Sequence, residues 1–439
     1  MSTAPTPDPQ PPAPGPQPPT PTADPSRLAD DLRAIGEIGA LPDGGVTRPG
    51  FTPLERQAHD LVGGWLRELG LEPRTDAIGN TIAERQGRRP GPFIGLGSHL
   101  DSVPHGGRFD GIAGVVGAVE LVRLLNEAGL ITDHPLRVVL FVGEEGARFG
   151  EPCIGSKAIV GGWDGRDLSR VRDTEGISLA AALAALGCDP GRLSEARWRP
   201  GEVAAFLELH IEQGRVLEAE GRQVGLVDVV SGSTRLRLEV RGRADHSGGT
   251  PMSLRADALN AAAEIALTVE SLAIDPRHRG TRATIGRLDL YPNSMTTVPG
   301  RVTLVVDVRD VDSDRQRTAA SEIVQRAHWI CERRGVQLAA EVIADTSPAV
   351  LSMWLRELIS NACRDLDLNY RVMSSGAGHD AAILARLVPA AMVFVPSRDG
   401  LSHVPEEWTS AADIARGVDV LYDTVLRLDR FLAEQEGRT

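Results

Sequence analysis

The sequence predicts a larger α/β domain, with a mostly parallel sheet and flanking helices, that is interrupted by an inserted α+β domain. Short apolar runs alternate with helical patterns in the first half of the chain, which is typical of strands and helices in succession. A middle segment alternates apolar and polar residues with a period of two instead, and the first pattern returns near the C-terminus. A chain of 439 residues is long enough for two or three domains.

In the larger domain, four short apolar runs have the pattern of strands that are buried on both faces: 93–97, 136–142, 205–209 and 390–395. Apolar residues at helical spacing predict a helix with one apolar face after Asp110: Val115, Val119, Val122 and Leu125. Functional sites of open α/β sheets lie outside the carboxyl ends of the strands. Polar side chains that follow these runs are therefore the first candidates for a site.

The inserted domain is predicted at 228–346. Apolar residues alternate with charged ones around Leu238 and with mostly polar ones around Val306, which indicates an antiparallel sheet with one covered face. Helical patterns run over 254–272 and 314–334. This order of strands and helices is βαββαβ, as in ferredoxin-like domains. The larger domain then consists of two parts, 27–227 and 347–439.

Composition and charge exclude several classes of protein. The net charge of −13 disfavours nucleic-acid binding, which needs a basic surface. The chain has no run of 18 apolar residues and no leader with a basic start, so neither a membrane span nor a secretory signal is expected. The cysteines show no paired framework and indicate buried thiols in a cytoplasmic protein: Cys153, Cys188, Cys331 and Cys363. Eleven of the 30 prolines precede residue 26, so residues 1–26 are predicted to form a disordered tail.

Five side chains of the types that bind divalent metals lie at or near the predicted strand ends: His99, Asp110, Glu145, His210 and His403. Two divalent cations that share one carboxylate need about this number of nitrogen and oxygen ligands, with a position left for water. These ligand types suit zinc, manganese, cobalt or nickel. Glu144 is adjacent to a ligand but is not needed as one, which is the usual position of a general base.

The acidic residues among these candidates, and Asp101 beside His99, also have a plainer interpretation. Asp101 is placed to hold the ring of His99 from two residues away, but such a triplet also occurs in surface turns. Asp110 is equally suited to capping the helix that follows it. Glu144 and Glu145 repel each other unless a cation or a proton intervenes, and otherwise form a solvated acidic turn.

Three further residues have two interpretations each. His246 lies on a loop among small residues of the inserted domain, where it is either a donor to a developing oxyanion or an ordinary loop histidine. His379 has the same two interpretations. Arg309 lies on the uncovered face of its strand and is either a planar, two-point grip for a carboxylate or an ordinary surface arginine.

Seven motifs together resemble the hydantoinase/carbamoylase amidases of the zinc aminoacylase-like metallohydrolases, a family that includes N-carbamoyl-L-amino acid hydrolase, allantoate amidohydrolase and β-ureidopropionase. The motifs are GSHLDSVPHGGRFDGIAGV, GEEGARF, LHIEQGRVLE, ADHSGGTPM, PNSMTTVPGRV, SGAGHDA and LSHVPEEWT. The similarity spans Leu28 to Leu432. LHIEQG is specific, because the wider superfamily usually has an acidic ligand where this chain has His210.

The resemblance assigns roles to individual positions of this chain. It implies two metal sites, one of His99, Asp110 and His210 and one of Asp110, Glu145 and His403. It implies that Glu144 is the acid and base, and we expect Asp101 and His246 to act with it in catalysis. Substrate contacts are expected from the following residues: Gln213, His246, Asn293, Thr296, Arg309, Gly378 and His379.

The resemblance also implies a homodimer that forms through the inserted domain. In such a dimer His246 reaches the partner's active site, and the domain closes over the substrate as a lid. One position departs from the family: Thr296 stands where members often carry a second asparagine, while Asn293, the first, is retained. A threonine lacks the paired donor and acceptor of an amide, so the substrate contact at this position is expected to differ.

These observations together predict a dinuclear, metal-dependent amidohydrolase. Its substrate is expected to be an N-carbamoyl amino acid or an allantoate-like molecule that bears a carboxylate and a linear carbon–nitrogen bond. An N-acyl amino acid deacylase or a dipeptidase with the same metal site is the close alternative. A non-catalytic binding protein is a remote alternative, because all five ligands and the base are present.

Overall fold

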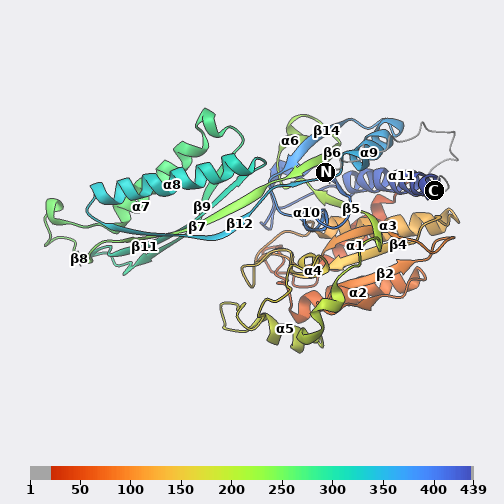
Figure 1. Ribbon diagram of the computed structural model, residues 1–439, viewed down its shortest axis with the longest axis horizontal. Helices are drawn as coiled ribbons and strands as arrows, with labels where there is room; N and C mark the ends of the chain where they lie inside the picture. Colours follow the sequence, from red (N-terminus) through yellow and green to blue (C-terminus); the bar gives the residue numbers. More distant parts are fainter. Residues whose placement is uncertain (1–20, 437–439) are drawn as a thin grey trace, which may run out of the picture. The chain divides into compact units, whose positions relative to one another are not determined.

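The computed structural model describes residues 21–436, and the chain forms two compact units (Figure 1). The first part of the larger unit ends at Asp228, and its second part begins at Val350. The smaller unit consists of Val229–Ala349, where the sequence predicts an insert at 228–346.

The sheet of the larger unit is parallel at its centre, which confirms the predicted fold class. Its strand order is β1-β2-β4-β3-β5-β15-β6-β13, and β14 also pairs with β6. The central strands run parallel to one another: β4 (Leu136–Phe141), β3 (Phe93–His99), β5 (Val203–Ile211) and β15 (Ala390–Val395). Antiparallel strands flank them: β2 (Thr81–Arg85) and β6 (Val224–Val230). Short strands complete the sheet: β1 (Arg74–Thr75), β13 (Ala349–Val350) and β14 (Tyr370–Ser375).

The four central strands are the four apolar runs of the sequence, and they are buried along almost their whole length. One boundary differs in a way that matters for the site. The strand predicted to end before His210 continues to Ile211, so His210 is a strand residue rather than a loop residue. Its neighbour Ile211 is fully buried, which explains why the strand extends past the histidine.

Long helices pack on this sheet: α2 (Pro53–Glu68), α3 (Ile112–Glu127), α9 (Met353–Asp365) and α11 (Ala411–Glu436). A further helix, α1 (Pro25–Gly36), packs on α3 and α11. Shorter helices lie in the connections: α4 (Ile154–Ile159), α5 (Leu179–Ala185), α6 (Val216–Ala219) and α10 (Asp380–Leu384). The prediction of a single apolar face is wrong for α3, which is buried on nearly all sides because it packs on β3, β5, α1 and α11. Its buried carboxylate, Glu120, is paired with Arg27 and Arg123.

Helix α1 starts at Pro25, within the predicted tail, so part of that tail is ordered. Residues 1–20 of that tail lie outside the described residues. Asp24 caps α1 by accepting two of its backbone N–H groups, and Pro25 takes the first helical position, where an N–H would have no partner. Ala23 is buried, and its N–H donates to Asp419. The predicted tail 1–26 therefore has to be shortened at its C-terminal end.

The smaller unit is an antiparallel sheet with two helices packed on it, in the predicted βαββαβ order (Figure 1). Its strand order is β12-β7-β11-β9. The strands are β7 (Gly232–Arg241), β9 (Arg282–Tyr291), β11 (Arg301–Asp310) and β12 (Gln337–Thr346), and the helices are α7 (Ala258–Ala273) and α8 (Ser313–Arg333). Alternate residues of β7 and β11 are buried in a core shared with both helices, as the two-residue alternation predicts.

Two details of the smaller unit differ from the prediction or add to it. α7 begins at Ala258 rather than at residue 254, because the side chain of Asp257 caps the helix there. The loop that carries His246 contains a short strand, β8 (Asp245–His246), which pairs with β10 (Thr297–Val298).

The structure tests the predictions of buried thiols and of no membrane span. All four cysteines are free thiols, and three of them are buried as predicted. Cys188 is partly exposed instead, because it lines a cavity of the larger unit. No helix within residues 21–436 has both the length and the apolar character needed to cross a lipid bilayer.

Gly97 is the point where β3 approaches β4 too closely for a side chain. Its φ is 149°, and a Cβ at this position would lie 1.8 Å from the carbonyl oxygen of Val139. We expect Gly97→Ala to lower the free energy of unfolding by about 2–4 kcal/mol, through backbone strain and forced separation of the strands. Gly64→Ala in α2 is the matched control, because a Cβ there meets no atom within 4 Å. The control should be neutral or stabilising by up to about 1 kcal/mol in denaturant unfolding, and equal stabilities would contradict the prediction.

Candidate metal centre

The five predicted metal ligands come together at the carboxyl ends of the central strands. His99 is the last residue of β3, Glu145 follows β4, and His210 lies near the end of β5. Asp110 immediately precedes the residue that caps α3, and His403 lies in the connection from β15 to α11. The strand order places β4, β3, β5 and β15 side by side, so these separate sequence positions share one edge of the sheet.

Asp110 is the common member of two groups of ligand-type side chains. Its Oδ1 lies 3.1 Å from His210 Nε2 and 3.6 Å from His99 Nε2. Its Oδ2 lies 3.1 Å from His403 Nε2, which in turn is 3.2 Å from Glu145 Oε2. Each group places its ligand atoms within 4.8 Å of one another. The alternative of Asp110 as a helix cap is wrong, because Gly111 occupies the cap position.

Two histidines direct Nε2 at Asp110 and use Nδ1 to bond to the backbone. His210 Nδ1 donates to the carbonyl oxygen of Ile211 at 2.9 Å, and His99 Nδ1 lies 3.2 Å from the carbonyl oxygen of Asp101. A carbonyl oxygen only accepts, so Nδ1 carries a proton in each ring, and in the neutral form of the ring Nε2 presents a lone pair. Within the described residues, His210 Nε2 and Glu145 Oε1 are buried and have no hydrogen-bond donor. Lone pairs directed at carboxylate oxygens are the arrangement that a divalent cation requires, so the residues fit a metal.

The charges of this cluster interact strongly because most of it is buried. Burial alone would raise the pKa of Asp110, but the imidazoles of His210, His403 and His99 outweigh it and hold the pKa well below its usual range. Asp110 and Glu145 together raise the pKa of His403 to about 11. Opposite charges at these distances interact more strongly in a buried site than in water.

Asp101 supports both His99 and the acidic turn that follows β4. Its Oδ1 is 3.4 Å from His99 Nδ1, as the spacing of the two residues predicts. The same carboxylate also accepts the backbone N–H groups of Glu144 at 2.9 Å and of Glu145 at 3.1 Å. Asp101 therefore fixes the positions of one histidine and of both glutamates relative to one another.

Glu144 is a buried carboxyl group beside both groups of ligands. Its Oε2 is 3.9 Å from His99 Nε2, and its Oε1 accepts from the thiol of Cys153 at 3.0 Å. Burial, with repulsion from Asp380 and Glu145, raises its pKa well above the usual value. The solvated acidic turn is therefore excluded for Glu144. A carboxyl group that holds a proton more tightly than usual is suited to accept and return one.

Two residues expected to contact a substrate contact the metal centre itself. Gln213 Nε2 donates to Asp110 Oδ2 at 2.7 Å and lies 3.2 Å from Ser402 Oγ. The ring of His379 is 2% exposed and packs edge-on against His210, with their centroids 4.5 Å apart. Its Nε2 is 2.8 Å from Ser375 Oγ. At Gly378, beside this histidine, a Cβ would meet no atom within 4 Å, so the backbone there borders open space.

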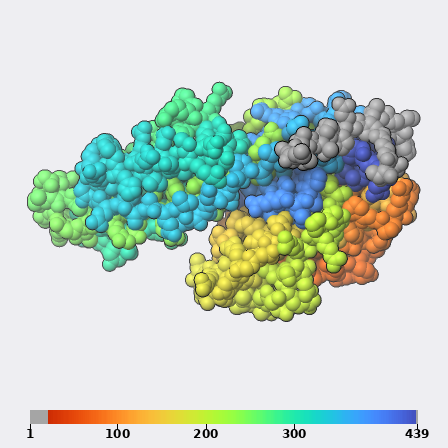
Figure 2. Space-filling view, viewed as in Figure 1, coloured from red at the N-terminus to blue at the C-terminus, as the bar shows by residue number. Residues whose placement is uncertain are grey.

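The remaining expected residues lie at two opposite ends of the smaller unit. His246 is the last residue of β8, which Figure 1 labels at one tip of the smaller unit; this tip is green in Figure 2. The backbone N–H of Ser247 donates to the carbonyl oxygen of Thr296 at 2.9 Å. Asn293 lies in the same connection as Thr296. Arg309 lies eight residues along β11 from Arg301, at the end of the sheet where β7 begins and β12 ends. At the rise of a strand this separation is roughly 26 Å.

His246 has a defined tautomer, and Arg309 has a defined partner. Nδ1 of His246 accepts the backbone N–H groups of Gly248 at 3.1 Å and Gly249 at 2.9 Å, so Nε2 carries the proton. Nε of Arg309 donates to Asp307 Oδ2 at 2.7 Å. His246 is thus prepared to donate a hydrogen bond from Nε2.

Three buried carboxyl groups support the centre but were not singled out from the sequence. Glu407 accepts the backbone N–H groups of Phe109 and Asp110 with Oε1 and the hydroxyl of Ser402 with Oε2. Glu208 accepts from Ser98 Oγ and from the N–H of Ala381, and Asp380 accepts from Ser156 Oγ. Glu208 could have been found from the sequence, because it is a carboxyl group inside an apolar stretch. A carboxyl group in such a position is buried and needs polar partners.

Comparisons with known proteins agree on one family. Residues 95–427 match the model of peptidase family M20/M25/M40. An N-carbamoyl-L-amino acid amidohydrolase of Geobacillus stearothermophilus is 44% identical over 92% of this chain and 98% of its own length. The allantoate amidohydrolase of Bacillus subtilis is 33% identical over 91% and 97%. The crystal structure of a hydantoinase/carbamoylase family amidase from Burkholderia vietnamiensis is 35% identical, covers 92% of this chain and 97% of that one, and has a TM-score of 0.83.

The shared position of Asp110 makes a specific prediction for metal content. We expect His210→Ala and His403→Ala each to lose one of about two bound divalent ions per chain, and Asp110→Ala to lose both, because only Asp110 belongs to both groups. His134→Ala is the control, since this buried histidine pairs with Asp429 before the start of β4, away from the centre. Elemental analysis after dialysis against manganese or zinc measures the ratio. If Asp110→Ala retained one ion, the shared-ligand assignment would be wrong.

Proposed function

The chain belongs to peptidase family M20/M25/M40, and we propose that it is an amidohydrolase that uses two divalent metal ions to cleave a linear ureido or amide bond. The substrate class is an N-carbamoyl amino acid or an allantoate-like molecule with a free carboxylate. The position of the Asp110 carboxylate between two groups of imidazole and carboxylate ligands carries this proposal. The chain is similar to two amidohydrolases over almost its whole length, which supports cleavage of a linear carbon–nitrogen bond.

Divalent ions held by the two groups would polarise the scissile carbonyl and lower the pKa of an attacking water. Glu144 is the residue that accepts the proton of that water and returns it to the departing nitrogen, since it is buried beside both groups. Asp101 keeps Glu144 in place through its backbone N–H. Water adds to the carbonyl carbon and the carbon–nitrogen bond breaks, which leaves a free amine and, from an N-carbamoyl group, a carbamate that decays to carbon dioxide and ammonia.

His246 and Arg309 act on the carbonyl and the carboxylate of the substrate in this proposal. Nε2–H of His246 donates to the carbonyl oxygen as negative charge develops there. Arg309 binds the free carboxylate through its planar guanidinium. Thr296 lies next to the His246 turn, where its short hydroxyl replaces the amide that relatives often carry, and it changes which substituent the substrate may have at that point.

The opposite placement of these two residues supports a homodimer. Arg309 lies roughly 26 Å along β11 from Arg301, and His246 pairs with Thr297, four residues before Arg301. This separation exceeds the length of a small substrate, so one copy of the smaller unit cannot supply both contacts to one molecule. Two copies related by symmetry supply them if each active site takes His246 from the partner and Arg309 from its own chain. We infer a cytoplasmic location, which the four free thiols support.

A substrate panel tests the proposed activity. The panel consists of N-carbamoyl-, N-formyl- and N-acyl-L-amino acids, dipeptides, allantoate and the methyl esters of the best substrates, each assayed with enzyme reconstituted with manganese, zinc, cobalt or nickel. We expect the ureido acids to have the highest kcat/KM and their esters to lose at least about 30-fold, as truncating one side of a buried charge pair does. Preference for N-acyl amino acids or dipeptides would contradict the ureido specificity and identify a deacylase or dipeptidase.

Glu144→Gln is expected to keep both metal ions and to lower kcat by about 10²- to 10⁴-fold, because the amide cannot accept the proton. Glu145→Gln is the matched control on the neighbouring residue and should instead weaken one metal site. Metal content and kcat of the two variants are measured side by side. If Glu144→Gln lost metal but kept its turnover, the roles of the two glutamates would have to be exchanged.

A mixing experiment tests the composite site. His246→Ala and Glu144→Gln should each be inactive alone, and an equal mixture that has exchanged subunits should recover about a quarter of wild-type activity, since half of its dimers hold one intact site. Each variant taken through the same exchange protocol by itself is the control. Exchange verified by mass-tagged subunits, without recovery of activity, would show that His246 does not serve the partner's site.

A further inference from the structure

The turn that carries Glu144 and Glu145 is held by buried carboxylates from two other elements. The backbone N–H of Gly143 donates to Glu55 Oε1 at 2.8 Å. The N–H groups of Glu144 and Glu145 donate to the two oxygens of Asp101. Glu55 belongs to α2, 88 residues before Gly143, so this helix contributes a hydrogen bond directly to the acidic turn.

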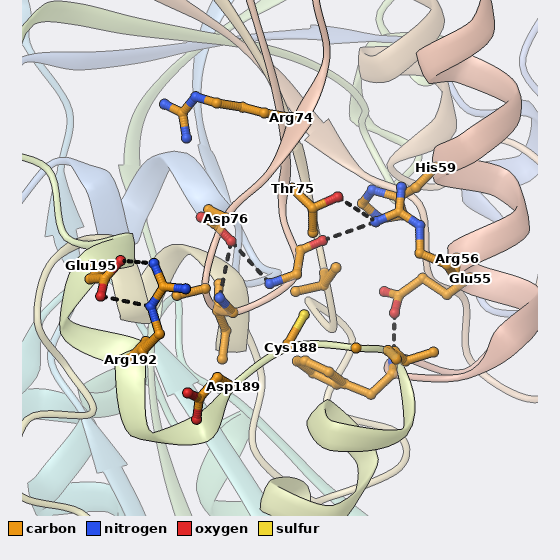
Figure 3. A pocket seen from close by; sticks show the side chains of 17 residues that line it. Glu55, Arg56, His59, Arg74, Thr75, Asp76, Cys188, Asp189, Arg192 and Glu195 are labelled. Carbon is orange, nitrogen blue, oxygen red and sulfur yellow. Dashed lines mark hydrogen bonds and ion pairs between the residues drawn. The ribbon is translucent and has the colours of Figure 1, made fainter.

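Glu55 also fixes the chain segment that packs against the same turn. Its Oε2 accepts the backbone N–H of Phe51 at 2.5 Å, which Figure 3 shows as a dashed line below Glu55. Gly143 has a φ of 60°, and a Cβ on it would lie 2.5 Å from the ring of Phe51. Gly143 is therefore enclosed by Phe51 on one side and hydrogen-bonded to Glu55 on the other. The Glu55 carboxylate is only 1% exposed, so water does not compete for these hydrogen bonds.

A cavity borders Phe51 and Glu55, the two residues that contact Gly143. The cavity has a volume of about 470 Å³ and is lined by Phe51, Glu55 and Val142, among other residues (Figure 3). Val142 directly precedes Gly143. Charged side chains on the cavity wall are bonded to one another, as Arg192 is to Glu195, so we assign no ligand to the cavity itself. On this side the turn is therefore held by its contact with Phe51 and by the hydrogen bond from Gly143 to Glu55.

We propose that Glu55 is a positioning residue for the acidic turn: it holds Gly143 at the point where β4 ends, and so sets the positions of Glu144 and Glu145. This inference rests on the proposed function only for its catalytic readout. Peptide groups are planar and stiff, so a displacement at Gly143 is passed to the next two residues. A shift of about 1 Å in a catalytic group can cost about 100-fold in rate.

Glu55→Gln is the discriminating change, because it keeps the size of the side chain. A carboxylate accepts with both oxygens, whereas an amide has one oxygen and an NH₂ group that would face either the Gly143 or the Phe51 N–H. We expect kcat to fall about 10- to 100-fold with KM within about threefold of wild type, and Glu145-dependent metal binding to weaken about 10-fold. Amide hydrogen exchange of residues 142–147 in the metal-loaded enzyme should become faster.

Asp429→Asn is the matched control. Asp429 is also a buried carboxylate that accepts two consecutive backbone N–H groups, those of Asp133 and His134 at 2.8 Å each. These residues precede β4, whereas Gly143 lies beyond its other end. Asp429→Asn should lower thermal stability but leave the metal affinity, the kcat and the exchange of 142–147 within about twofold of wild type.

Three outcomes decide the inference. Slower turnover, weaker metal binding and faster exchange in Glu55→Gln alone would support it, whereas no change, or equal changes in Asp429→Asn, would overturn it. If Glu55→Gln does not fold, Glu55→Asp replaces it, since this variant keeps both oxygens but is one methylene shorter and should show the same changes to a smaller degree. If wild type lacks amidohydrolase activity, the proposed function fails, and metal affinity and exchange still test the role of Glu55.

Discussion

The Asp110 carboxylate is the interaction on which the rest of the larger unit depends. It must direct one oxygen to His99 and His210 and the other to His403, and these residues come from different strands and connections. Because β4, β3, β5 and β15 are parallel neighbours, their carboxyl ends lie at one edge of the sheet. The buried helix α3 fixes Asp110, which precedes the cap residue of that helix. Glu407 then accepts the Asp110 N–H and ties this loop to the Ser402 hydroxyl beside His403. Much of the architecture around the site thus serves the orientation of one carboxylate.

The centre concentrates negative charge in a buried place. Besides the ligands, buried carboxyl groups lie in it or directly behind it: Glu55, Asp101, Glu144, Glu208, Asp380 and Glu407. Burial with repulsion from Glu208 raises the pKa of Asp380 to about 8. Each buried charge costs several kcal/mol unless it is compensated. Many of these carboxylates accept backbone N–H groups or hydroxyls, and divalent cations are the natural counterions for the others.

Sequence patterns predicted the central strands well because an apolar run is a local signal, and they singled out five ligand-type side chains that the structure places together. The run 390–395 and the strand β15 share both ends, and the ligand types stood out at strand ends. The sequence could not show that α3 is enclosed by α1 and α11, since a helical period reports one face and not the partners that cover the others. Nor could it assign Glu55 or Glu407, because their partners, Gly143 and Asp110, are distant in the chain and are reached through the backbone. The apolar run predicts a strand end before His210, because a polar residue normally ends such a run, whereas β5 continues to Ile211.

The two connections of the smaller unit have a consequence for how the chain folds. The chain enters through β7 and leaves through β12, and these strands are neighbours in which Ser233 pairs with Thr346. On the larger unit, the N–H of Leu351 donates to the carbonyl oxygen of Asp228 at 2.9 Å, so the two ends meet there as well. Once the smaller unit has folded, its own sheet holds the two halves of the larger unit about one strand spacing apart, roughly 5 Å. More than a hundred residues separate the two parts of the larger unit in the sequence. Once the smaller unit has folded, however, the entropy cost of joining these parts is that of closing a very short loop.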